Sequence, residues 1–228
     1  MFFDVNYLIF VFVPTLLLSL VAQAFVRSAY SKWSKARNGS GLSGVQVAER
    51  IFSRTNVGAV RLEGAPGQLS DHYDPTAGVV RLSEGIATVP SVASMAVVAH
   101  ELGHVQQHQE RSVLITMRNF LVPGVQLAPQ IGYLMIFAGL FLRVTGLIWA
   151  GILLFGVMVV FMILTLPVEI DASRRGLILL RESGLLVAEQ DASGARQVLT
   201  AAALTYVAAA ISAVLQLLYF ISIAQRRR

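Results

Sequence analysis

Long apolar runs, separated by two polar segments, dominate the pattern along the chain. The first run, residues 5–26, is long enough to cross a bilayer, which takes about 20 mostly apolar residues. The stretch 130–168 is longer than one crossing needs, and its only charged residue before its end, Arg143, stands beside the turn-prone residues 145–146. We therefore expect two helices there, joined by a tight hairpin. With a last apolar run at 198–224, the pattern predicts about four transmembrane helices.

The distribution of basic residues predicts which side of the membrane the polar segments face. Lys and Arg close to the spans are held on the cytoplasmic side. Residues 27–118 hold ten of them and residues 174–196 hold four, against four in Arg143 and the terminal 226–228. We therefore expect the polar segments to face the cytoplasm, and the first run to be an uncleaved anchor because positive charges follow it rather than precede it. The terminal arginines oppose this orientation, so the last helix either spans the membrane or lies in its interface.

The composition agrees with a membrane protein. Of the 228 residues, 55% are hydrophobic and 14% are charged, which is more apolar than a typical soluble domain. The net charge of +5 does not indicate nucleic-acid binding, because the Lys and Arg residues flank apolar runs instead of forming a stripe with aromatic residues. The chain has no cysteine, so any transition metal must be held by His, Asp or Glu.

Residues 96–107 read AVVAHELGHVQQ and carry the strongest functional signal. The pattern is helical, and His100 and His104 lie four residues apart on one helical face, so both imidazoles can bind one ion. Glu101 projects beside such an ion and can deprotonate a water molecule. Zinc suits this arrangement, because it polarises a peptide carbonyl and lowers the pKa of its water to about 7. The motif predicts a zinc peptidase.

A catalytic zinc usually has three protein ligands, so a third must be found. On an unbroken helix His108 would lie about 12 Å from His100, too far to share one ion. His108 could be a ligand only if the helix broke after His104; otherwise it orients a ligand or faces water. Glu169 is the better candidate, because it follows the third span, where Pro167 is expected to disturb the helix, and emerges on the same side of the membrane as the motif.

Four segments together resemble the YugP-type neutral zinc metallopeptidases of bacterial membranes. They read DHYDP at 71–75, VVRLSE at 79–84, AHELGHVQQH at 99–108 and EIDASRRG at 169–176. The resemblance covers almost the whole chain. It implies a Zn2+ ion held by His100, His104 and Glu169, with Glu101 as the general base.

The chain is more distantly similar to the HtpX and CAAX-prenyl-protease group. There the ligand Glu is followed four residues later by an Asp that orients a zinc histidine. Ser173 stands at that place in this chain, so the orienting role cannot be carried over, and Asp171 or Ser173 is left as the candidate.

The polar segment before the motif is expected to form a small α+β structure. Residues 46–56 have the pattern of a short amphipathic helix, and residues 60–62 and 79–82 have the pattern of strands joined by a turn-rich loop. An edge strand beside a zinc site can hold an extended substrate by main-chain hydrogen bonds, and residues 79–83 are the candidate for it. The alternative is an ordinary core strand.

Two further candidates for catalysis lie in the turn-like segment 71–75. Asp-Pro turn chemistry accounts for its last two residues but poorly for His72 and Tyr73. A histidine ring and a phenol are both groups that stabilise a developing oxyanion, so we expect one of them to approach the metal opposite Glu101. A purely structural loop is the alternative.

Together these features predict an α-helical integral membrane protein with a small α+β, zincin-like metalloprotease lobe. The expected parts are an anchor at 1–27, the cytoplasmic metalloprotease lobe at 28–125, a transmembrane hairpin at 126–168, a segment with the third zinc ligand at 169–197 and a transmembrane or interfacial helix at 198–228. We expect the protein to be a zinc endopeptidase of the plasma membrane. Its active site would face the cytoplasm, and its substrates would be membrane-associated proteins or peptides. A non-catalytic zinc-binding membrane scaffold or chaperone-like protein is the alternative, although a scaffold needs no general base such as Glu101. A channel or transporter is disfavoured, because Arg143 is the only ionisable residue expected in the spans.

Overall fold

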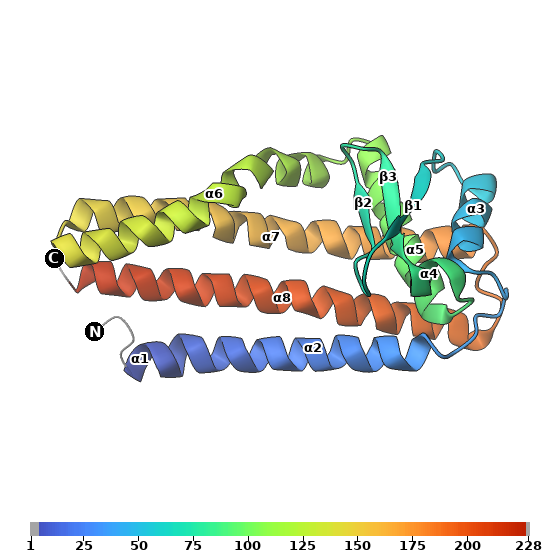
Figure 1. Ribbon diagram of the computed structural model, residues 1–228, viewed down its shortest axis with the longest axis horizontal. Helices are drawn as coiled ribbons and strands as arrows, with labels where there is room; N and C mark the ends of the chain where they lie inside the picture. The colour runs from blue at the N-terminus through green and yellow to red at the C-terminus, as the bar shows by residue number, and fades with distance from the viewer. Residues whose placement is uncertain (1–4, 227–228) are drawn as a thin grey trace. The chain divides into compact units, whose positions relative to one another are not determined.

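The computed structural model describes residues 5–226 and is mostly helical, with one small sheet among the described residues (Figure 1). The elements in chain order are α1 (Val5–Tyr7), a π-helical turn (Leu8–Phe12), α2 (Val13–Trp33), α3 (Gly44–Arg54), β1 (Arg61–Ala65), β2 (His72–Asp74), β3 (Val79–Ser83), α4 (Glu84–Thr88), α5 (Val92–Gln109), α6 (Val113–Leu142), α7 (Thr145–Glu182) and α8 (Glu189–Gln225). The chain forms two compact units. Unit 1 contains the residues up to Ala22, Thr116–Pro167 and the residues from Leu204, whereas unit 2 contains Gln23–Ile115 and Val168–Ala203.

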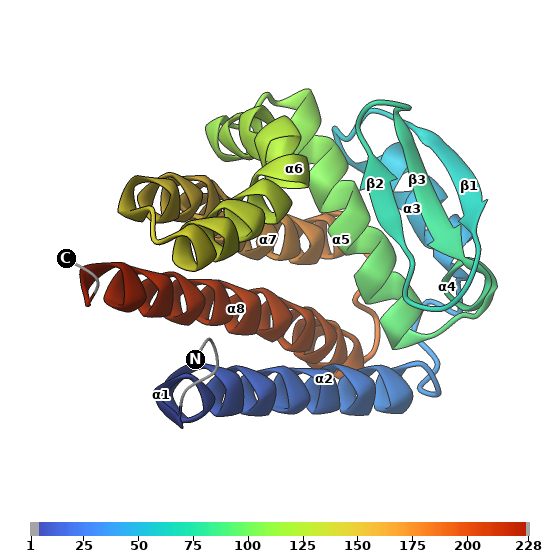
Figure 2. The same cartoon turned by 60° about the vertical axis from the view of Figure 1, so that its left-hand side comes forward.

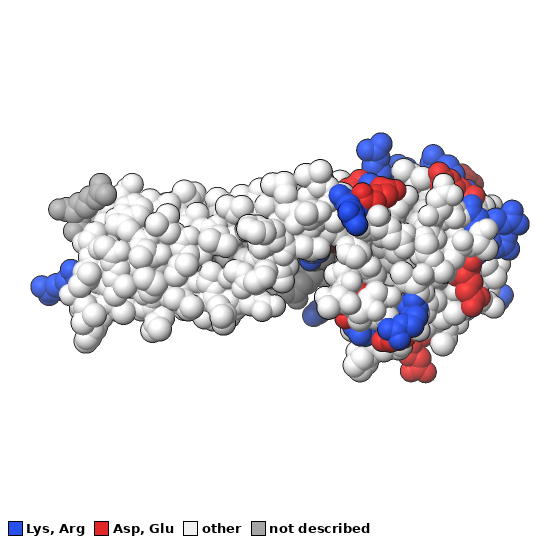
Figure 3. Space-filling model, turned by 90° about the horizontal axis from the view of Figure 1, so that it is seen from above, with Lys and Arg blue, Asp and Glu red and all other residues white. Residues whose placement is uncertain are grey.

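Four helical stretches among the described residues are long and apolar enough to cross a membrane, by length and composition. They are Val5–Trp33, Val113–Leu142, Thr145–Glu182 and Glu189–Gln225, which confirms the predicted number of long apolar helices. The described part of unit 1 holds just three charged residues, Arg118, Arg143 and Arg226. In Figure 3 the charged side chains accordingly gather on unit 2, and unit 1 shows an almost uncharged surface. Such a surface suits the interior of a bilayer.

The expected hairpin forms the centre of unit 1. α6 and α7 are joined through Arg143 and Val144, and Arg143 has the positive φ of 59° that so short a connection requires. The two helices approach closely at a pair of glycines. A Cβ on Gly132 would stand 2.9 Å from the carbonyl oxygen of Gly151, and one on Gly151 would stand 2.6 Å from that of Gly132. Small residues at the contact thus allow the close packing that membrane helices favour.

The helices extend further than the apolar runs in the sequence indicate. α6 begins at Val113 rather than near residue 130, and α7 continues past Pro167 to Glu182. The expectation that this proline disturbs the helix is therefore wrong. A proline lacks the N–H that would donate one hydrogen bond of the helix. Packing against neighbouring helices can nevertheless hold the turns on either side of it in helical conformation. Glu169 consequently sits on a continuous helix, which fixes its side chain more firmly than an irregular segment would.

The sheet of unit 2 has the strand order β1-β3-β2, with β1 parallel and β2 antiparallel to β3 (Figure 2). The register pairs Leu62 and Tyr73, from opposite sides, with Val80 of β3. β3 is thus the central strand, and the prediction that residues 79–83 form an edge strand is wrong. The cause is β2, which lies inside the segment 71–75 that we expected to be a turn. β1 and β2 are the outer strands.

The core of unit 2 surrounds α5, most of whose residues are buried. α3 and α4 both pack against it. The expected amphipathic helix is α3, whose first turn is closed by reciprocal hydrogen bonds between Ser43 and Gln46. α5 in turn is capped by Ser91, whose hydroxyl accepts a hydrogen bond from Ser94 N. A helix capped and buried in this way is a rigid support for the side chains of its motif.

Candidate metal centre

Three side chains of unit 2, from two different helices, converge on one point. His100 and His104 come from α5, and Glu169 comes from α7. The Oε2 atom of Glu169 lies 3.3 Å from Nε2 of His100 and 3.5 Å from Nε2 of His104. One potential ligand atom from each residue lies within 4.8 Å of the other two. The sequence motif and the carboxylate predicted to join it are therefore brought together.

Two glycines bring the helices close enough for this convergence. A Cβ on Gly103 of α5 would collide with the carbonyl oxygen of Ala172 on α7. A Cβ on Gly176 of α7 would stand 2.8 Å from the carbonyl oxygen of Ala99 on α5. Larger residues at these positions would push the two backbones apart. The glycine inside the motif thus serves the approach of Glu169, which lies one turn before Ala172.

The three residues fit a zinc ion. Glu169 is 3% exposed, and its Oε2 is buried with no hydrogen-bond partner among the described residues. A buried carboxylate oxygen needs a donor or a cation to offset its lost hydration. Ligands bound to tetrahedral zinc at about 2.0–2.1 Å stand about 3.3 Å apart, close to the spacing between Glu169 and the histidines. Two imidazoles and a carboxylate are also a ligand set that zinc accepts in catalytic sites.

The Nδ1 atoms of the two histidines face away from the point of convergence and have their own partners. His100 Nδ1 lies 3.1 Å from Ser173 Oγ, and His104 Nδ1 lies 3.0 Å from Gln107 Oε1. Such outer contacts hold the rings with Nε2 toward the metal position. Of the two residues expected for this role, Ser173 contacts a histidine directly, whereas Asp171 accepts a hydrogen bond from Gln107 at 2.7 Å.

The electrostatic setting of His104 favours a positive charge. Burial lowers the pKa of His104, but the close contact with the Glu169 carboxylate and the negative charges of Glu101 and Glu169 outweigh it, and the pKa lies above its ordinary value. A site that stabilises a proton on a buried imidazole also stabilises a cation bound in its place.

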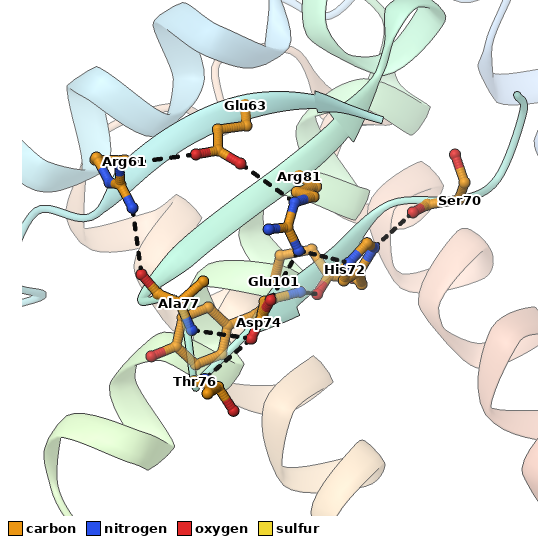
Figure 4. Close-up of polar contacts among 10 residues, drawn as sticks. Arg61, Glu63, Ser70, His72, Asp74, Thr76, Ala77, Arg81 and Glu101 are labelled. Carbon is orange, nitrogen blue, oxygen red and sulfur yellow. Dashed lines mark hydrogen bonds and ion pairs between the residues drawn. The ribbon is translucent and has the colours of Figure 1, made fainter. Parts of the chain in front are cut away.

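Glu101 lies beside the convergence point and is held by the sheet. Its carboxylate is nearly buried, with the residue 7% exposed, and Oε2 accepts a hydrogen bond of 2.8 Å from the main-chain N–H of Tyr73 on β2 (Figure 4). The outer strand β2 therefore runs next to the carboxylate. Glu101 does not belong to the group of three potential ligands found among the described residues. Its position agrees with a base that acts beside the metal rather than on it.

The side chain of Tyr73, whose main-chain N–H contacts Glu101, pairs with His108. The hydroxyl of Tyr73 lies 3.1 Å from Nδ1 of His108, and the two rings meet edge to face. Burial and the charge of Asp74 raise the pKa of Tyr73, so the phenol keeps its proton and can donate it in a hydrogen bond. α5 continues without a break to Gln109, so His108 remains two helical turns from His100.

His72 has different partners. Its ring is exposed, with Nδ1 2.8 Å from the carbonyl oxygen of Ser70 and Nε2 3.4 Å from a guanidinium nitrogen of Arg81 (Figure 4). Arg81 also binds Asp74 at 2.8 Å and Glu63 at 3.2 Å. Because neighbouring residues of a strand point to opposite faces, His72 joins this ion network while Tyr73 points to the other side of the sheet.

Gln107 is a residue of the site that the sequence pattern did not identify. It lies one turn after His104 on the buried side of α5 and is 0% exposed. A glutamine three residues after a predicted metal ligand was the available signal, because positions i and i+3 share a helical face.

Comparison with known proteins gives two matches. The family model described as "Putative neutral zinc metallopeptidase" matches residues 8–225. The chain is also 40% identical over 215 residues to the "Putative membrane protease YugP" of Bacillus subtilis (strain 168). The matched residues make up 94% of this chain and 95% of that protein. No solved structure matches the chain.

Proposed function

The chain belongs to the neutral zinc metallopeptidase family, and on this basis we propose that it is a zinc-dependent endopeptidase of the plasma membrane. Its substrates would be membrane proteins or their membrane-proximal segments, since the site and the long apolar helices belong to one chain. The main observation behind the proposal is the convergence of His100, His104 and Glu169 on one point, with the charge of Glu101 acting on His104. These three residues would hold the zinc ion.

The reaction is hydrolysis of a peptide bond. Zinc held by these residues would polarise the substrate carbonyl and lower the pKa of a water molecule to about 7. The Glu101 carboxylate accepts that proton as the water oxygen attacks the carbonyl carbon. The C–N bond then breaks, and Glu101 passes the proton to the leaving nitrogen. The N–H of Tyr73 keeps the carboxylate in the orientation that both transfers need.

We assign the stabilisation of the developing oxyanion to Tyr73. Its phenol keeps its proton and lies on the strand that contacts Glu101, and His108 fixes the position of its oxygen. For His72, the contacts with Ser70 and Arg81 favour a structural role in the sheet.

We also propose that β2 binds the substrate backbone, in place of residues 79–83. The central strand β3 is hydrogen-bonded on both sides, so it has no edge to offer. β2 is an outer strand, and its Tyr73 N–H reaches the general base. An extended peptide added along β2 would therefore run beside Glu101.

Removal of the metal tests the proposed activity. In detergent micelles, the purified protein should cleave β-casein. A zinc chelator should abolish the cleavage, because a water molecule that is not activated by the metal attacks the peptide bond far more slowly. Addition of one equivalent of Zn2+ after removal of the chelator should restore it. Cleavage sites are identified by mass spectrometry. Chelator-resistant cleavage, or cleavage that zinc cannot restore, would contradict a zinc peptidase.

The orientation in the membrane is a second prediction. Fourteen basic residues in the polar segments, against four elsewhere, favour a cytoplasmic position for Ser40 and the metal centre. Because the chain has no cysteine, Ser40→Cys and Asn6→Cys each introduce a single thiol. In intact cells a membrane-impermeant thiol reagent should label the variant at position 6 and should label the variant at position 40 only after permeabilisation. Labelling of position 40 in intact cells would reverse the orientation.

A further inference from the structure

Gln107 is a completely buried polar side chain whose three contacts all bear on the metal centre. Its Oε1 lies 3.0 Å from Nδ1 of His104. Its Nε2 donates to the carbonyl oxygen of Val168 at 2.9 Å and to Oδ2 of Asp171 at 2.7 Å. Both acceptors belong to α7, the helix that carries Glu169. The amide of Gln107 therefore links the second histidine ligand to the helix of the third ligand.

The contacts leave the amide a single orientation. The carbonyl of Val168 and the carboxylate of Asp171 can only accept hydrogen bonds, so the NH2 group of Gln107 must face them. Asp171 also accepts a hydrogen bond of 2.7 Å from Arg175 Nε, which keeps it an acceptor. In the flipped amide, the buried oxygen of Gln107 would face two acceptors and would have no donor there. Oε1 must therefore face His104.

This orientation determines the tautomer of His104. An amide oxygen has no proton to give, so Nδ1 of His104 must carry the proton of their hydrogen bond. The neutral ring then has its lone pair on Nε2, the atom that lies 3.5 Å from Glu169. Only this tautomer can bind a metal ion through Nε2.

We propose that Gln107 is the positioning residue of the metal centre, which locks His104 in its metal-binding tautomer and ties it to α7 through Asp171. The proposal rests on the proposed zinc site and adds to it an orienting residue on the motif helix itself. Arg175 continues the chain of contacts, because its NH1 donates to Glu110 at 2.6 Å. The fixed amide thus stands at the inner end of a hydrogen-bonded chain that leads to the surface.

The two histidines are not held in the same way. The partner of His100 Nδ1 is the Ser173 hydroxyl, which can donate or accept a hydrogen bond. Ser173 therefore orients the ring of His100 without selecting its tautomer. Loss of the Ser173 hydroxyl should weaken zinc binding less than loss of the Gln107 amide.

The first test is zinc affinity, measured by competition with a chromogenic chelator on the purified full-length protein. Gln107→Leu should raise the Kd for zinc by about 10- to 100-fold, and Ser173→Ala should raise it less. Met95→Ala is the matched control, because Met95 is equally buried on α5 but lies in the apolar core. This control should lower Tm and leave the zinc Kd unchanged. The visible spectrum of the Co2+-loaded protein should change in Gln107→Leu and stay unchanged in the control.

The second test uses the wild-type protein and does not depend on how the variants fold. In the zinc-loaded protein, 15N NMR of the four histidines should show His104 with a proton on Nδ1 and zinc on Nε2. A His104 that carries its proton on Nε2, or an unchanged zinc Kd in folded Gln107→Leu, would overturn the proposal for Gln107. A wild-type protein that binds no zinc would instead overturn the proposed function, so the two failures are distinguishable.

Discussion

Glu101→Gln is expected to abolish peptide hydrolysis while leaving zinc bound. Glutamine has the shape of glutamate, and its oxygen can still accept the hydrogen bond from Tyr73 N, so the fold around the motif should persist. Its amide cannot accept the proton of the attacking water, and general-base catalysis is worth about 10²- to 10⁴-fold in rate. The measurements are kcat/KM for β-casein and zinc per chain by elemental analysis.

The exposed Glu49 on α3 supplies the control for this variant. Glu49→Gln removes the same charge away from the motif and should leave both values unchanged. If Glu101→Gln cleaved casein as fast as the wild type, Glu101 would have no part in the mechanism. The same pair of variants distinguishes a peptidase from a zinc-binding scaffold, because neither substitution would impair the function of a scaffold.

Glu169→Ala is expected to lose zinc and hydrolysis together, to about the extent of His100→Ala and His104→Ala. Each variant leaves two ligands, and a site with two protein ligands is far weaker than one with three. The expectation rests on the buried Oε2 of Glu169, which has no hydrogen-bond partner among the described residues. Zinc affinity is read from chelator competition.

His108→Ala is the comparison for Glu169→Ala. His108 contacts Tyr73 and lies two turns along an unbroken helix from His100, so its loss should change the zinc Kd by no more than about 10- to 100-fold. Loss of zinc in His108→Ala, with full retention in Glu169→Ala, would reverse the assignment of the third ligand.

The parts of the site that could be predicted from sequence are those fixed by local geometry or by the count of spans. The spacing of His100 and His104 places both on one face of a helix, whatever surrounds that helix. Two expected crossings between the polar segments would return the chain to the side it left, and this count makes Glu169, which follows the third apolar run, a candidate ligand. The hairpin turn at Arg143 followed from one charge within a long apolar stretch.

The parts that could not be predicted depend on contacts between distant segments. β2 has three residues in a sequence rich in turn formers, so it shows no alternation, and its presence alone makes β3 a central strand. The helix through Pro167 is held by packing that the local sequence does not encode. The role of Gln107 could not be predicted from its own helix, because it depends on the hydrogen bonds with Val168 and Asp171 of α7. The need for a glycine at position 103 likewise arises only from the close approach of α7.

The metal centre is tested most directly by X-ray absorption at the zinc edge of the purified protein, together with its zinc content. We predict one zinc ion per chain, coordinated by nitrogen and oxygen at about 2.0–2.2 Å, with two histidines among its ligands. The combined variant His100→Ala, His104→Ala, Glu169→Ala should contain none. Wild-type protein without stoichiometric zinc, or zinc that persists in the combined variant, would contradict the claim that these three residues form a catalytic metal centre.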